Sequence, residues 1–171
     1  NNPAQNFAVF DETLQILKKA LSEERFSHHG KYYTFPAPGF SADMAHTIDD
    51  PAYTDPETGE LAKLTTLPRP LQQPHPPLWI VVNSDLSIQH AAENDCGIIM
   101  WRPPVKMLKA RLKLYQETYQ KSHGRSIEFG ANTAIARDIF VAETDAEARR
   151  ICEGPLMGGL NFSNWRGPYI Y

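Results

Sequence analysis

The pattern of apolar and polar positions is clearest between Pro77 and Ala92, where an unbroken apolar run gives way to a helical pattern. Residues 78–82 (Leu-Trp-Ile-Val-Val) form the run, and Asn83 and Ser84 end it. A short run rich in β-branched residues, bounded by proline and small polar residues, predicts a parallel strand covered on both faces. Apolar residues then recur at helical spacing, with Ser84 at the helix N-cap position. We therefore predict a strand that turns directly into a helix.

Two regular elements and a long irregular segment precede this corner. Apolar residues at three- and four-residue spacing predict a helix over 4–23, and aromatic runs on both sides of Gly30 predict a small hairpin over 25–35. Residues 36–77 hold nine of the fourteen prolines, and the middle of this segment is acidic and poor in aliphatic residues. We expect a proline-rich, acidic loop insert without regular structure at 36–77, mobile within 41–67.

Strands and helices alternate after the corner. A second buried strand is expected at 95–101, followed by an amphipathic helix that starts with proline at its first position and ends near Gly124. A third strand is expected within 127–141, and a capping box at Thr144–Glu147 predicts a further helix. Strands separated by helices predict an α/β fold with a parallel sheet, either open or closed as a barrel. The tail 154–171 has no assigned element.

Composition narrows the classes of partner and compartment. The net charge of −3 provides no basic face for nucleic acid, and no apolar run reaches the roughly 20 residues of a spanning helix. No signal peptide is visible, and the two isolated cysteines are typical of thiols in a reducing cytoplasm. We expect a cytoplasmic protein that binds neither nucleic acid nor membrane. The chain begins with Asn1, and we expect it to be a piece of a longer protein.

The candidate chemistry lies at the strand–helix corner. A glutamate or glutamine would complete a capping box three residues after Ser84, but that position is Ser87. Two hydroxyls and the first free backbone N–H groups of the helix would then point the same way, which makes an anion site. The alternative is a plain N-cap with a surface hydroxyl.

Other motifs do not indicate a site. Ser87 and His90 lack a third orienting group, so a hydrolase is not expected. His28 and His29 are adjacent in a predicted strand and point to opposite faces, and the acidic insert does not match a calcium-binding loop, so no metal is expected. Gly158-Gly159 lacks the context of a dinucleotide-binding turn and is expected to be a loop.

Several further segments occur together in one order along the chain; they are Phe10-Asp11-Glu12, Gly30-Lys31-Tyr32-Tyr33, Pro68-Arg69-Pro70-Leu71-Gln72, Pro74-His75-Pro76-Pro77, residues 78–84, Ala91-Ala92, Ile98-Ile99-Met100-Trp101 and residues 141–148. In this order they resemble the luciferase-like flavin monooxygenases, the family of bacterial luciferase and alkanal monooxygenase. The resemblance covers nearly the whole chain except the acidic insert and the tail. It implies a (β/α)8 TIM barrel, of which residues 1–171 form a single partial domain. This chain would supply about strands five to seven, from the C-terminal half of the barrel.

The resemblance also implies a cofactor and its contacts. The family uses reduced flavin, usually FMN supplied by a separate flavin reductase, and molecular oxygen to oxidise a small organic substrate. Its flavin phosphate rests at positions that correspond to Asn83, Ser84 and Ser87, and an aromatic residue at the position of Trp101 flanks the flavin ring. Arg102 could reach an anionic substrate or a flavin carbonyl. The catalytic histidine belongs to an earlier part of the barrel, so no catalytic residue is assigned here.

Two alternatives of the same fold remain open. One is a hydride-transfer oxidoreductase that uses the deazaflavin F420, and the other is a non-catalytic flavin-binding subunit. We expect the protein to form a homodimer or a heterodimer.

Overall fold

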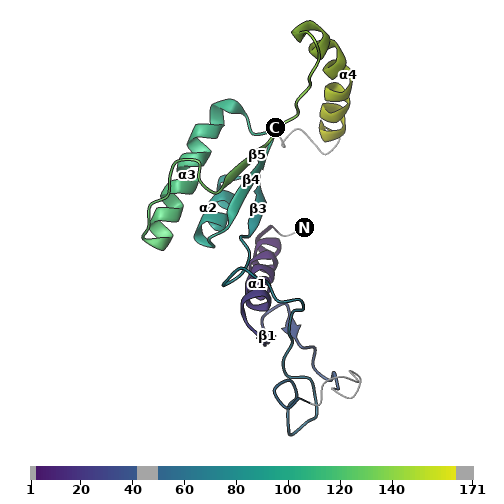
Figure 1. Ribbon diagram of the computed structural model, residues 1–171, viewed down its shortest axis with the longest axis vertical. Coiled ribbons are helices and arrows are strands. Elements are labelled where there is room, and N and C mark those ends of the chain that lie inside the picture. The colour runs from purple at the N-terminus through teal and green to yellow at the C-terminus, as the bar shows by residue number, and fades with distance from the viewer. Residues whose placement is uncertain (1–2, 42–49, 165–171) are drawn as a thin grey trace. The chain divides into compact units, whose positions relative to one another are not determined.

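The computed structural model describes residues 3–41 and 50–164 (Figure 1). The elements in chain order are α1 (Pro3–Ser22), β1 (His28–His29), β2 (Thr34–Phe35), β3 (Trp79–Val82), α2 (Asp85–Glu93), β4 (Gly97–Trp101), α3 (Val105–His123), β5 (Thr133–Ala136) and α4 (Asp145–Asn164). The chain divides into two compact units, Asn1–Pro77 and Leu78–Tyr171. The expected single partial barrel domain stays a prediction.

The first unit contains the predicted helix and hairpin. β1 and β2 pair antiparallel, with His28 opposite Phe35 and His29 opposite Thr34. The described part of 36–77 holds no helix or strand, as expected; isolated bridges such as Phe26 to Leu64 and turn hydrogen bonds such as Gly59 N–H to the Asp55 carbonyl order it. Part of the predicted mobile segment, 42–49, lies outside the described residues, and the mobility itself stays a prediction.

The second unit is built on a three-stranded parallel sheet in the order β3-β4-β5. α2 packs against α3 and against β3 and β4 (Figure 1). On the face of the sheet that α2 covers, side chains of alternate strand residues and of α2 form the buried core; they are Val82, Ile88, Ala91, Ala92, Ile98 and Met100. The strand–helix–strand–helix–strand order confirms the predicted α/β class with parallel pairing.

Residue Tyr115 of α3 ties that helix to the start of β4. Its hydroxyl donates to the Cys96 carbonyl at 2.9 Å, and burial raises the pKa of the Tyr115 phenol to about 12. Gly124 ends α3 in the left-handed conformation at φ 66°, as the sequence predicted. Pro104 is the N-cap and Val105 the first helical residue, so proline lies one position earlier than expected.

The sequence predicts that the strand after Pro77, which is β3, is covered on both faces, and this prediction is wrong for the described chain. Strand side chains alternate, so Ile80 and Val82 share one face and Trp79 and Val81 the other. Val82 is buried, whereas Val81 is 62% exposed. By register, Ile99 and Trp101 of β4 continue the side of Val81. We call this the open face.

The expected loop at residues 158–159 is also wrong, because α4 continues through it. The predicted cap is present at its start, where the Thr144 hydroxyl accepts from the Glu147 backbone N–H at 3.2 Å. Once a first turn is fixed, each further residue adds a hydrogen bond at little cost, and a helical glycine costs only about 1 kcal/mol. None of the helices in the described ranges is long and apolar enough to cross a membrane.

Candidate functional site

The carboxyl ends of all three parallel strands meet at one edge of the sheet. Val82 lies opposite Met100, and Met100 lies opposite Ile135. The residues that follow each strand, including Asn83 and Arg102, are therefore neighbours along this edge, which we call the carboxyl edge. In open α/β sheets, ligands bind at this edge.

Ser84 and Ser87 form a reciprocal capping box at the start of α2. Ser84 Oγ accepts from the Ser87 N–H at 3.2 Å, and Ser87 Oγ accepts from the Ser84 N–H at 3.1 Å. Serine at the third helical position thus does what a glutamate or glutamine usually does. The hydroxyls also bond to each other at 3.1 Å, and Ser87 Oγ donates to the Ser84 carbonyl at 2.8 Å.

Because of this capping box, an anion at the corner would contact different groups from those that the sequence predicts. The sequence predicts that the two hydroxyls and the free backbone N–H groups point the same way, but the hydroxyls bond within the corner. Within the described residues, the backbone N–H groups of Asp85 and Leu86 have no acceptor, and both residues are exposed. These two N–H groups lie at the positive end of the helix. The exposed Asp85 carboxylate lies at the same end and opposes a second negative charge.

Arg111 of α3 supplies a cation that the sequence analysis missed. Its Nη2 donates to the Asn83 carbonyl at 3.1 Å, and its Nε lies 3.9 Å from Asp85 Oδ1. The Arg111 side chain is only 15% exposed. Sequence spacing gave no signal for it, because the contact depends on how α3 packs beside α2. The corner therefore combines two free N–H groups, one guanidinium and one carboxylate.

Trp101 and Arg102 form a second cluster on the carboxyl edge. Trp101, the last residue of β4, is 53% exposed. The Arg102 guanidinium carbon lies 5.0 Å from the centre of the Trp101 ring. Arg102 also pairs with Asp138, with Nε 2.5 Å from Oδ2 and Nη2 donating to Oδ1 at 2.8 Å. The hydrogen bond from Arg102 holds the pKa of the Asp138 carboxyl below its usual value.

Asp138 is another residue that sequence reasoning missed. It lies two positions after the end of β5. A signal was available, since the carboxyl end of any parallel strand is a candidate site position. The sequence predicts the third strand only somewhere within 127–141, a range too broad to identify the end of the strand. The ion pair also means that Arg102 already has a carboxylate partner.

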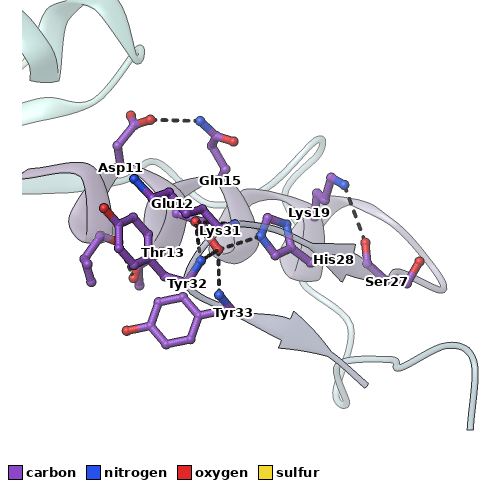
Figure 2. A network of polar contacts seen from close by, with 11 residues as sticks. Asp11, Glu12, Thr13, Gln15, Lys19, Ser27, His28, Lys31, Tyr32 and Tyr33 are labelled. Atoms are coloured by element: carbon purple, nitrogen blue, oxygen red, sulfur yellow. Dashed lines mark hydrogen bonds and ion pairs between the residues drawn. The ribbon is translucent and has the colours of Figure 1, made fainter. Parts of the chain in front are cut away.

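In the first unit, polar contacts around Glu12 connect α1 to the hairpin (Figure 2). Glu12 of α1 accepts from the backbone N–H groups of Lys31, Tyr32 and Tyr33 at 2.8–3.1 Å, and lies 3.1 Å from His28 Nε2. Burial raises the pKa of the Glu12 carboxyl, but the hydrogen bonds with His28, Tyr33 and Tyr32 outweigh it and bring the pKa below its usual value. Over the described ranges, no three histidine, cysteine or acidic side chains converge as metal ligands.

A comparison with protein-family models identifies one family, and solved structures share its fold. The family model described as luciferase-like monooxygenase matches residues 1–166. Two solved structures share the fold: monooxygenase RslO1 from Streptomyces bottropensis (TM-score 0.60, 19% identity, 88% of this chain) and the oxygenating constituent of 3,6-diketocamphane monooxygenase from Pseudomonas putida (TM-score 0.57, 22% identity, 94% of this chain). The second is a type II Baeyer–Villiger monooxygenase in complex with FMN. This chain spans 38% of the length of each.

Proposed function

This chain belongs to the luciferase-like monooxygenase family, and we propose that it supplies the flavin-phosphate end of a flavin-dependent monooxygenase site. In this proposal the three parallel strands are about the fifth to seventh of a (β/α)8 barrel. Reduced FMN from a separate reductase and molecular oxygen would oxidise a small organic substrate. The flavin supplies the oxygen chemistry when bound, and the protein binds it, orients it and excludes water.

The observation that carries the proposal is that a polar corner and an exposed aromatic side chain lie on the same carboxyl edge. The corner after β3 offers N–H groups and a guanidinium, which suit a phosphate. Trp101, one strand away, offers an exposed indole, which suits a flat aromatic ring. Neighbouring strands are about 4.8 Å apart, so one FMN can reach both.

The residues of the corner fit a phosphate in a specific way. The free N–H groups of Asp85 and Leu86 would donate to its oxygens, and Ser84 and Ser87 would hold the turn and can rotate a hydroxyl toward it. Arg111 would offset the Asp85 carboxylate, whose charge otherwise opposes binding. Asn83, whose carbonyl is held by Arg111, would contact the ligand through its exposed side chain.

The test uses two substitutions that preserve the helix cap but differ in charge. Asparagine and aspartate both cap helices as well as serine does. Ser84→Asn is expected to raise the FMN dissociation constant by less than about threefold, whereas Ser84→Asp raises it at least about tenfold through repulsion of the phosphate. The double variant Ser84→Ala with Ser87→Ala is expected to weaken FMN binding by about 1–3 kcal/mol.

Riboflavin, which lacks the phosphate, is the matched control ligand. Its dissociation constant should be the same in the Ser84→Asn and Ser84→Asp variants, measured by flavin fluorescence on the full-length protein. Equal loss of FMN and riboflavin in Ser84→Asp, or no loss of either, contradicts the phosphate assignment. Binding of F420 in place of FMN would support the hydride-transfer alternative, and FMN binding without oxidation of any substrate would support a non-catalytic subunit.

A further inference from the structure

The residue after Trp101 has an unusual backbone conformation for its type. Arg102 has φ 49°, in the left-handed region that residues with a side chain rarely adopt. Its N–H still donates to the Ala136 carbonyl at 3.0 Å, so the backbone remains tied to β5 at this point. Such a conformation persists only where the surrounding contacts hold it, and it is found disproportionately at functional sites.

This conformation changes where the Arg102 side chain lies. In a continuing strand, consecutive side chains point to opposite faces, and Arg102 would point away from Trp101. Here the guanidinium instead lies over the Trp101 ring, with its carbon 5.0 Å from the ring centre. A guanidinium at this distance is attracted to the face of an indole. One face of Trp101 is therefore covered by Arg102, although the residue as a whole is 53% exposed.

Asp138 fixes the guanidinium from the neighbouring strand. Two atoms of Arg102, Nε and Nη2, approach the two carboxylate oxygens of Asp138 at 2.5 and 2.8 Å. The Nη2 contact is a hydrogen bond and the Nε contact an ion pair, and together they restrict the rotation of the guanidinium plane. It also offsets the charge of Arg102, which is then poorly suited to be the principal partner of an anionic substrate.

We infer that Arg102 and Asp138 are positioning residues for Trp101, covering one face of the indole and leaving the opposite face to stack on the ligand's ring. The identity of that ring as a flavin rests on the proposed function above. The positioning itself does not, because the contacts are made by the chain alone.

The test follows Trp101 in the full-length protein without flavin. Trp79→Phe and Trp165→Phe remove the other two tryptophans of this sequence. Any tryptophan of the full-length protein outside this sequence is replaced by phenylalanine as well. In this background we compare Asp138→Asn, Asp138→Glu and Arg102→Gly, since glycine accepts the left-handed backbone at no cost. Glu117→Gln is the matched control, because Glu117 pairs with Lys113 on the surface of α3 at 3.4 Å.

Acrylamide quenching and fluorescence anisotropy of Trp101 are the readouts. We expect Asp138→Asn and Arg102→Gly to raise the quenching constant about twofold, because the second indole face becomes accessible, and to lower the anisotropy. Asp138→Glu should restore most of the parent values, and Glu117→Gln should match the parent. Unchanged quenching and anisotropy in both Asp138→Asn and Arg102→Gly would overturn the inference.

A flavin titration of the same variants separates this inference from the proposed function. Asp138→Asn should raise the dissociation constants of FMN and riboflavin alike, about threefold to tenfold, because the change lies on the ring side of the site. A parent protein that binds neither flavin contradicts the proposed function, while the quenching data still decide whether Trp101 is positioned. If Asp138→Asn weakens the binding of FMN but not of riboflavin, Trp101 does not contact the flavin ring, and the inference that it stacks on the ring is overturned.

Discussion

At the residue scale, the Arg111 guanidinium connects α3 to the strand–helix corner, in addition to the capping box of Ser84 and Ser87. Arg111 reaches from α3 to the Asn83 carbonyl and to the Asp85 carboxylate, and it is mostly buried there. A buried arginine with these partners both fixes the backbone that leads into α2 and supplies the positive charge beside its N-terminus. If the corner binds a phosphate, Arg111 should matter as much as the serines that the sequence singled out.

Replacement of Arg111 by glutamine is expected to raise the FMN dissociation constant about tenfold, the scale of a lost hydrogen bond to a charged group. The loss has two sources, because the Asn83 carbonyl loses its donor and the Asp85 carboxylate is left without its counter-charge. Lys109→Gln removes the same charge from an exposed position of the same helix and should change the constant less than about twofold. Similar effects of the two substitutions on FMN titrations would show that only the net charge matters.

The corner also shows how far residue patterns can predict a site. The position of the strand, the turn at Ser84 and the start of α2 could be predicted, because apolar periodicity and capping chemistry are local. The reciprocal bonding of the two serines could not, since the usual partner at that position is a longer side chain. Arg111 could not be predicted for a different reason, because it contacts the corner from another element, across 28 residues of sequence. Asp138 contacts Arg102 across 36 residues, and only its place after a strand end signalled it.

At the element scale, Glu12 attaches the hairpin to α1. Three consecutive backbone N–H groups of the turn donate to one carboxylate of the helix (Figure 2). A Cβ at Gly30 in the same turn would overlap Glu12 Oε1 and His28 Nε2, so a larger residue there would displace the Glu12 and His28 side chains from each other. The periodicity of α1 and the aromatic hairpin were predictable from sequence. Their connection through Glu12 was not, because an acidic residue in a helix is far more often a solvated one.

Replacement of Glu12 by glutamine should lower the thermal unfolding midpoint at pH 7 by about 3 °C or more, since a neutral amide is a weaker acceptor for three N–H groups. The pKa of Glu12 is below its usual value in the folded protein. Its stabilisation is therefore complete above the unfolded pKa, near 4.3, and is lost as the pH falls through the lower folded pKa. Urea unfolding at several pH values from 7 to 3 should show a smaller acid loss in Glu12→Gln than in the parent.

The control for this comparison is Glu24→Gln. Among the described residues the Glu24 carboxylate pairs only with its neighbour Arg25, and its side chain is 70% exposed, so its replacement should leave the midpoint nearly unchanged. If the two variants lose equal stability at pH 7 and show the same acid dependence, Glu12 does not anchor the hairpin.

At the scale of the whole molecule, the parallel sheet has one covered and one open face. Parallel sheets are found almost only with both faces covered, yet Trp79 and Val81 are largely exposed on the open face. The apolar side chains at these positions led to the prediction that both faces are covered, but the sequence does not indicate what covers them. In the proposed barrel, this face would line the packed interior, where apolar side chains from neighbouring strands fill the space.

A charge on the open face tests that arrangement in the full-length protein. Val81 is 62% exposed in the described chain, and Val81→Asp would cost little if the face met water. If the barrel closes over it, the same substitution buries a carboxylate and should lower the free energy of unfolding by at least about 3 kcal/mol. Leu86→Asp is the control, because Leu86 is 73% exposed in the first turn of α2, where an acidic side chain is favourable. Urea unfolding without flavin measures both, and a tolerated Val81→Asp would contradict the closed barrel while leaving the corner and its phosphate test untouched.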